Sequence, residues 1–142
     1  MATQFTIGGT RISFGEGRVR ELGRELESMD LSRALVVSDS GVIDAGVVDP
    51  ALASLREWGI DYRVFDGVRS NPRIEDAESA AAVAKDTGSE VIVAVGGGSP
   101  IDAAKAAAVV AAGGDSLREC EGEGHLPVVP LPVVAVPTTA GS

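Results

Sequence analysis

Short apolar segments alternate with longer amphipathic segments along most of this chain. The apolar segments are rich in Val and Ala with few polar positions, which is typical of parallel strands that are covered on both faces. They comprise residues 34–38, 62–65, 91–95 and 133–136. Helices are predicted between them, over residues 19–29, 50–58, 75–87 and 100–112. Strictly alternating strands and helices predict an α/β fold whose parallel strands are joined by right-handed crossovers.

The N-terminal segment has a different pattern. Two short apolar runs, Phe5 to Ile7 and Arg11 to Phe14, flank Gly8-Gly-Thr10 and predict a β-hairpin. The expected architecture is therefore a Rossmann-like parallel sheet with helices on both faces and an N-terminal β-hairpin. The chain has 142 residues, which suits a single domain, and we expect residues 1–142 to form one nucleotide-binding unit.

The most informative stretch is the buried strand that ends in three consecutive glycines. Val91 to Val95 leads into Gly96-Gly-Gly98, and no side chain of this turn can block an approaching ligand. Ser99 is then expected to be the N-cap of the next helix, with Pro100 at its first position and Asp102 completing a capping box. The free N–H groups and positive dipole end of such a helix suit a pyrophosphate.

The glycine turn does not match the general dinucleotide-binding fingerprint. A dinucleotide-binding fingerprint requires a third spaced glycine where this chain has Ile101, and it normally follows the first strand of its unit. A phosphate-binding loop and a merely tight turn between strand and helix are both compatible with the pattern.

Several polar loops follow the predicted strands directly. Ligands bind beyond the carboxyl ends of the strands in sheets of this kind. Asp39, the Ser70-Asn-Pro72 turn, the glycine turn and residues 137–142 all lie at or after strand ends. Four loops that are distant in sequence are therefore expected to converge on one edge of the sheet.

Composition narrows the possible partners. The net charge of −9 argues against nucleic acid or an anionic membrane surface as a ligand. No apolar run approaches the roughly 20 residues of a membrane span, and the first residues lack the features of a signal peptide, so cytoplasm is the expected location. A single cysteine, Cys120, excludes an internal disulfide, and the only histidine, His125, has no second His or Cys nearby to share a metal ion.

Two motifs together resemble those of the iron-containing alcohol dehydrogenases. They are Gly96-Gly-Gly-Ser-Pro-Ile-Asp-Ala-Ala-Lys105 and Val136-Pro-Thr-Thr-Ala-Gly-Ser142. Phe14-Gly-Glu-Gly17, Val37-Ser-Asp39 and Ser70-Asn-Pro72 fall in the order that the N-terminal half of that family shows. The resemblance covers essentially the whole chain and implies an NAD-binding half of a dehydrogenase.

The resemblance supports a cofactor role for several residues. Gly97, Gly98 and Ser99 would hold the pyrophosphate through their backbone N–H groups. Asp39 would accept hydrogen bonds from the adenosine ribose, and its charge would repel a 2′-phosphate, so NAD is expected over NADP. Its alternative role is an Asx-turn or a helix cap before Gly41.

Other matching residues have weaker arguments. The family's Asn-Pro turn suggests that Asn71 reaches the adenosine side of the cofactor, although this is also common turn chemistry. Thr138 and Thr139 would lie near the diphosphate and the nicotinamide-side ribose, or else make hydrogen bonds at a strand end. Asp102 would lie near the nicotinamide, or only cap its helix and pair with Lys105.

The family's reaction is hydride transfer between an alcohol and the nicotinamide, with a divalent metal, commonly iron, polarising the substrate oxygen. The resemblance implies that one Asp and three His from a C-terminal helical domain hold this metal. This sequence contains one histidine, so no metal ligand and no catalytic residue is predicted here. We expect the segment to bind NAD but not to oxidise alcohol alone, and its parent protein to form a homo-oligomer that acts on a small alcohol or aldehyde.

Two alternatives stay open at this stage. Glycerol dehydrogenases, glycerol-phosphate dehydrogenases and dehydroquinate synthases share a similar architecture and glycine loop. The Ser-Pro-Ile-Asp and Pro-Thr-Thr-Ala-Gly-Ser stretches favour the alcohol dehydrogenases among them. The second alternative is a stand-alone nucleotide-binding module without catalysis.

Overall fold

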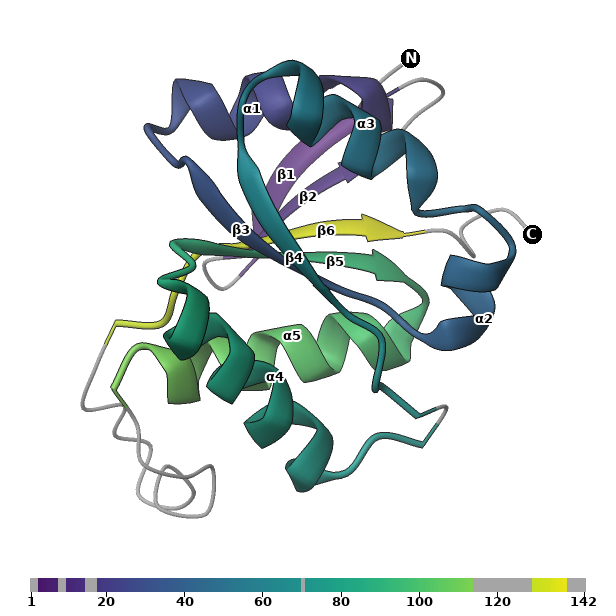
Figure 1. Ribbon diagram of the computed structural model, residues 1–142, viewed down its shortest axis with the longest axis vertical. Helices are drawn as coiled ribbons and strands as arrows, with labels where there is room; N and C mark the ends of the chain where they lie inside the picture. The colour runs from purple at the N-terminus through teal and green to yellow at the C-terminus, as the bar shows by residue number, and fades with distance from the viewer. Residues whose placement is uncertain (1–2, 8–9, 15–17, 70, 114–128, 138–142) are drawn as a thin grey trace.

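A computed structural model describes residues 3–7, 10–14, 18–69, 71–113 and 129–137. Six strands and five α-helices lie within these ranges, together with one short 3-10 helix (Figure 1). The strands are β1 (Thr3–Ile7), β2 (Thr10–Phe14), β3 (Arg33–Val37), β4 (Asp61–Phe65), β5 (Val91–Gly96) and β6 (Val133–Pro137). The helices are η1 (Arg18–Glu21), α1 (Leu22–Ser28), α2 (Ser40–Asp44), α3 (Asp49–Glu57), α4 (Ile74–Thr87) and α5 (Gly98–Ala111).

The strands form one sheet in the order β1-β2-β6-β5-β3-β4. The run β6-β5-β3-β4 is parallel throughout, and β2 joins it parallel to β6. β1 pairs antiparallel with β2 at one edge of the sheet. The residues between them, Gly8 and Gly9, lie outside the described residues, so the predicted β-hairpin stays a prediction. The predicted α/β fold with a parallel sheet is confirmed.

Helices cover both faces of the sheet (Figure 1). On one face, α4 and α5 pack with alanine methyl groups on Leu35, Val37 and Ile92. On the other face, α1 and α3 bring Leu22, Leu26, Val48, Ala51 and Leu55 onto the alternate residues of β3 and β5. β5 lies in the middle and is buried along its whole length, which explains why its sequence is a continuous apolar run.

Helix starts were the least accurate part of the sequence prediction. Ser99 does not cap α5: the helix begins at Gly98 with Gly97 as its N-cap, and no side chain makes a capping hydrogen bond. The predicted capping box with Asp102 is therefore wrong, because the glycine turn itself bends into the helix two residues early. The helix predicted over residues 50–58 also begins one residue earlier, since α3 starts at Asp49 and Val48 is its N-cap.

The short helix α2 was not predicted. Asp39 is its N-cap, and one carboxylate oxygen, Oδ1, accepts a 2.8 Å hydrogen bond from the N–H of Val42. The sequence Asp39-Ser-Gly41 is compatible both with an Asx-turn and with the start of a short helix. Only the geometry of the cap at Asp39 distinguishes the two.

The chain reverses its direction of travel across the sheet at β3. From β3 it moves outward to β4, and α4 then returns it to the other side of β3, where β5 continues toward β6. Loops from β3 and β5 therefore leave their adjoining strands in opposite directions, which opens a crevice at the carboxyl ends of these strands.

Candidate functional site

A pocket of about 790 Å³ lies at this reversal point. This volume is within the range of about 300–1,000 Å³ that is usual for small-molecule sites. Three loops line it, with residues 39, 40 and 42 after β3, residues 66–69, 71 and 73 after β4, and residues 97–100 after β5. The pocket therefore collects side chains from three parallel strands at the edge that the sequence predicted.

The glycine turn after β5 forms one wall of the pocket. Gly96 has a φ of +143°, and a Cβ there would lie 2.9 Å from Cγ of Pro100, so this position needs glycine for the fold. Gly98 is different, because a Cβ at this position would meet no protein atom within 4 Å. Packing within the described chain gives no reason for a glycine here, whereas close approach of a ligand does.

The first turn of α5 points into the same space. The N-cap of this helix is Gly97, which has no side chain that could accept a hydrogen bond from the N–H groups of the first turn. Together with the positive end of the helix dipole, these groups favour an anionic group such as a phosphate. The glycine turn thus combines room at Gly98 with donors from the backbone.

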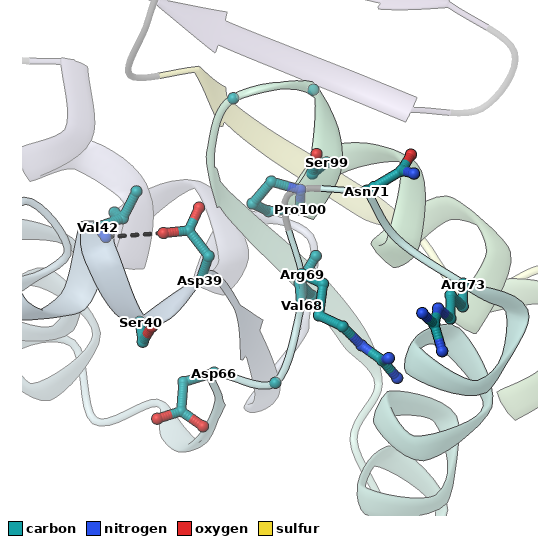
Figure 2. A pocket seen from close by; sticks show the side chains of 13 residues that line it. Asp39, Ser40, Val42, Asp66, Val68, Arg69, Asn71, Arg73, Ser99 and Pro100 are labelled. Carbon is teal, nitrogen blue, oxygen red and sulfur yellow. Dashed lines mark hydrogen bonds between the residues drawn. The ribbon is translucent and has the colours of Figure 1, made fainter.

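Asp39 lines the opposite side of the pocket (Figure 2). Its Oδ1 is used by the cap of α2, whereas no hydrogen bond to its Oδ2 occurs among the described residues. Both interpretations of this residue are compatible with the structure: the capping role is observed, and the second oxygen is available for a ligand hydroxyl.

The loop between β4 and α4 forms the third wall and carries Asn71, which is exposed and lines the pocket. A buried carboxylate beneath this loop belongs to Asp76, in the first turn of α4. Burial raises the pKa of Asp76, but hydrogen bonds from Arg73 and Arg69 and the charge of Arg69 hold this pKa below its ordinary value. The carboxylate is therefore ionised at neutral pH.

Charged side chains are divided between the walls. Asp39 and Asp66 lie on one side of the pocket, and Arg69 and Arg73 lie on the other (Figure 2). Arg69 pairs with Asp76, with 2.8 Å between Nη2 and Oδ1. The guanidinium of Arg73 makes no ion pair with any described residue.

Five of the predicted site residues come together in this pocket: Asp39, Asn71, Gly97, Gly98 and Ser99. Asp102 does not line it and is exposed on α5, without an ion pair to Lys105 among the described residues. Thr138 and Thr139 lie outside the described residues, as do Cys120 and His125.

Sequence reasoning missed four polar lining residues. These are Ser40, Asp66, Arg69 and Arg73. Asp66 directly follows β4, much as Asp39 comes two residues after β3, and this position could have identified it. The two arginines flank the Asn-Pro turn, but no sequence pattern fixes the direction in which such loop side chains point.

The described residues contain no group of three or more His, Cys, Asp or Glu side chains that could hold a metal ion. Among the helices that the structure describes, none has the length and apolarity needed to cross a membrane. The chemistry that this part of the chain can support is thus the binding of an anionic small molecule that also carries hydroxyl groups.

Comparison with known proteins identifies the family of this chain. Residues 9–142 match the family described as iron-containing alcohol dehydrogenase. The chain belongs to this family. The alcohol dehydrogenase 4 of Saccharomyces cerevisiae (strain YJM789) is 34% identical over 91% of this chain and 34% of its own length. The choline dehydrogenase of Bacillus subtilis (strain 168) is 37% identical over 94% of this chain and 34% of its own length.

A solved structure extends the comparison to a ligand. The sulfoacetaldehyde reductase of Bifidobacterium kashiwanohense in complex with NAD⁺ is similar to this chain with a TM-score of 0.81 and 32% identity. The match covers 92% of this chain and 35% of the reductase. This member of the iron-containing alcohol dehydrogenase family thus spans about a third of the length of the relatives that it matches.

Proposed function

We propose that this chain is the nucleotide-binding part of an NAD-dependent dehydrogenase that interconverts a small alcohol and its aldehyde. The observation that carries the proposal is the open position at Gly98, in the first turn of α5 and at the wall of the pocket. Glycine stands here although packing within the described chain does not require it, and a pyrophosphate would approach the backbone closely at this position. The family match supports this interpretation of the pocket, and favours the alcohol dehydrogenases over other enzymes of the same architecture.

Each wall of the pocket has a separate part in binding. The N–H groups around Gly97 and Gly98 hold the diphosphate, and the free Oδ2 of Asp39 accepts a hydrogen bond from an adenosine ribose hydroxyl. The negative charge of Asp39 disfavours a 2′-phosphate at the same place, so NAD binds better than NADP. Asn71 contacts the adenosine side from the third wall.

When NAD is bound, its nicotinamide supplies the hydride acceptor, and the chain's own residues hold and orient the rest of the cofactor. The described residues offer no metal site, so we assign no metal-dependent step to them. The relatives are named for alcohol, choline and sulfoacetaldehyde. Their common element is a carbon–oxygen centre that gains or loses a hydride, and we extend this substrate class to the whole protein.

The test is a calorimetric titration of the chain with NAD and with NADP. NAD is expected to bind, and NADP to bind at least about tenfold more weakly. Asp39→Asn removes the charge while an asparagine still caps α2, so it should reduce this preference without lowering stability. Asp44→Asn, on the same helix but outside the pocket, is the matched control.

Two results would contradict the proposal. Failure of both nucleotides to bind would remove the nucleotide-binding role. Binding of NAD and NADP with equal affinity in the unmodified chain would remove the role of Asp39, while leaving the glycine turn as a phosphate site.

A further inference from the structure

The loop before α4 is held from below by one buried side chain. The carboxylate of Asp76 is 4% exposed and accepts four hydrogen bonds. Its Oδ1 accepts from Nε and Nη2 of Arg69 at 3.0 and 2.8 Å. Its Oδ2 accepts from the backbone N–H of Arg73 at 3.1 Å and from that of Arg69 at 3.4 Å. The carboxylate of Asp76 thereby accepts hydrogen bonds from both Arg69 and Arg73, which lie on either side of Asn71 in the loop.

This segment includes Asn71, whose side chain makes no hydrogen bond to another described residue. Its other anchors are few. Val68 is buried, and the N–H of Asp76 donates a 3.0 Å hydrogen bond to the carbonyl oxygen of Arg73. Among the described residues of this loop, Val68, Arg69, Asn71 and Pro72 make no further backbone hydrogen bond to another described segment. The position of Asn71 therefore depends on the bonds to Asp76.

The pairing also determines which charges the pocket presents. Asp76 is neutralised by Arg69, so its carboxylate adds no negative charge to that wall. Arg73 gives only its backbone N–H to Asp76, and its guanidinium remains beside the pocket without an ion pair among the described residues. The wall that carries Asn71 is thus polar and positive, opposite the carboxylates of Asp39 and Asp66.

We propose that Asp76 is a positioning residue for the nucleotide pocket, which acts by fixing both ends of segment 69–73 so that Asn71 and Arg73 face a bound adenosine. This inference rests on the proposed function. A loop that is already ordered before binding loses less conformational entropy when the ligand arrives, so the benefit appears as affinity. The carboxylate touches no ligand and works only through the loop.

The test uses ADP as the probe, because ADP contains both the adenosine and the diphosphate. Asp76→Asn keeps the shape of the side chain but replaces one acceptor with a donor that faces an N–H donor. Glu90→Gln is the matched control. Glu90 also accepts hydrogen bonds from a neighbouring segment, at Ser32 and Arg33, but it lies just before β5, at the other end of that strand from the pocket.

Titrations are made well below the unfolding temperature of each variant, so that an affinity change does not reflect unfolding. Asp76→Asn is expected to raise the ADP dissociation constant about tenfold and to lower the NMR order parameter of the Asn71 amide. Glu90→Gln is expected to leave both quantities unchanged. Arg69→Gln removes the guanidinium bonds but leaves the backbone donors to Asp76, and it replaces Asp76→Asn if that variant does not fold.

The outcomes separate this inference from the function on which it rests. If the unmodified chain does not bind ADP, the proposed function fails. If the unmodified chain binds ADP and the Asp76→Asn or Arg69→Gln variant binds it within twofold, the positioning role is overturned and the proposed function stands. An equal loss of affinity in Glu90→Gln would likewise overturn the positioning role, since it would indicate a general effect of stability.

Discussion

The Oγ of Ser38 donates a 2.7 Å hydrogen bond to the carbonyl oxygen of Val95, and this bond joins the ends of β3 and β5 next to the pocket. Both residues are buried. Ser38 lies one residue beyond the end of β3 and one residue before Asp39. The bond therefore holds together the two strand ends from which two walls of the pocket depart.

Replacing Ser38 with alanine should lower the free energy of unfolding by about 1–2 kcal/mol, because a buried hydrogen bond is lost and a carbonyl group loses its donor. Urea unfolding followed by circular dichroism measures this change. Ser79→Ala, at an exposed position on α4, should change the same quantity by less than about 0.5 kcal/mol. Equal effects at the two serines would contradict the structural role of Ser38.

Gly96→Ala should destabilise the fold by about 1–3 kcal/mol. Alanine is strained at a φ of +143°, and its Cβ would collide with Pro100 in the first turn of α5. Thermal unfolding compared with the unmodified chain is the measurement. A variant as stable as the unmodified chain would show that the turn adjusts at little cost.

Gly98→Ala should separate binding from stability. The added methyl group meets no protein atom within 4 Å, so the free energy of unfolding should change by less than about 0.5 kcal/mol. The same methyl group occupies the space of the proposed diphosphate, so the NAD dissociation constant should rise at least about tenfold. Calorimetry and thermal unfolding of one preparation give both values. Unchanged NAD affinity would place the diphosphate elsewhere.

Low pH should reduce the free energy of unfolding, partly through protonation of Asp76. The pKa of this carboxyl is lower in the folded state than its ordinary value of 3.8, so the unfolded state binds more protons between the two values. The stabilisation is fully present above pH values near 3.8 and is lost as the pH falls through the folded-state pKa. Asp76→Asn should therefore show a smaller loss of stability between pH 5 and pH 2–3 than the unmodified chain, measured by urea unfolding at each pH.

Much of the fold could be predicted because single physical rules dominate the core. The run from Val91 to Val95 is apolar at every position, which only a strand covered on both faces explains well, and the structure agrees. The helix predicted over residues 75–87 is observed as α4, and its Ala80 and Ala81 are buried in the same core cluster as Leu35 and Ile92 of the sheet. Gly88 and Gly59 follow α4 and α3 with positive φ angles, as helix-stopping glycines should.

The site was predicted only in part. Strand ends located Asp39, Asn71 and the glycine turn, since parallel strands bring their carboxyl ends to one edge. The predicted start of α5 was wrong. Ser99 has a higher intrinsic preference for the N-cap position than Gly97, but the positive φ of Gly96 turns the chain into the helix before Ser99 is reached. The bonds between Asp76 and Arg69 span seven residues through a loop, and such a contact follows from tertiary structure that no local pattern encodes.

The alanines of α5 also set the height of the glycine turn above the sheet. Ala103, Ala104, Ala107 and Ala108 pack on the sheet and on α4 with nothing larger than a methyl group. Small side chains at these positions allow close packing of α5, and an added carbon at a fully buried alanine would have to be accommodated by movement of its neighbours. A larger residue at Ala107 should push α5 away from the sheet, and the glycine turn, about 13 Å away along the helix axis, should move with it. The alanine side chains of α5 thus influence the position of the glycine turn and the geometry of the pocket that it lines.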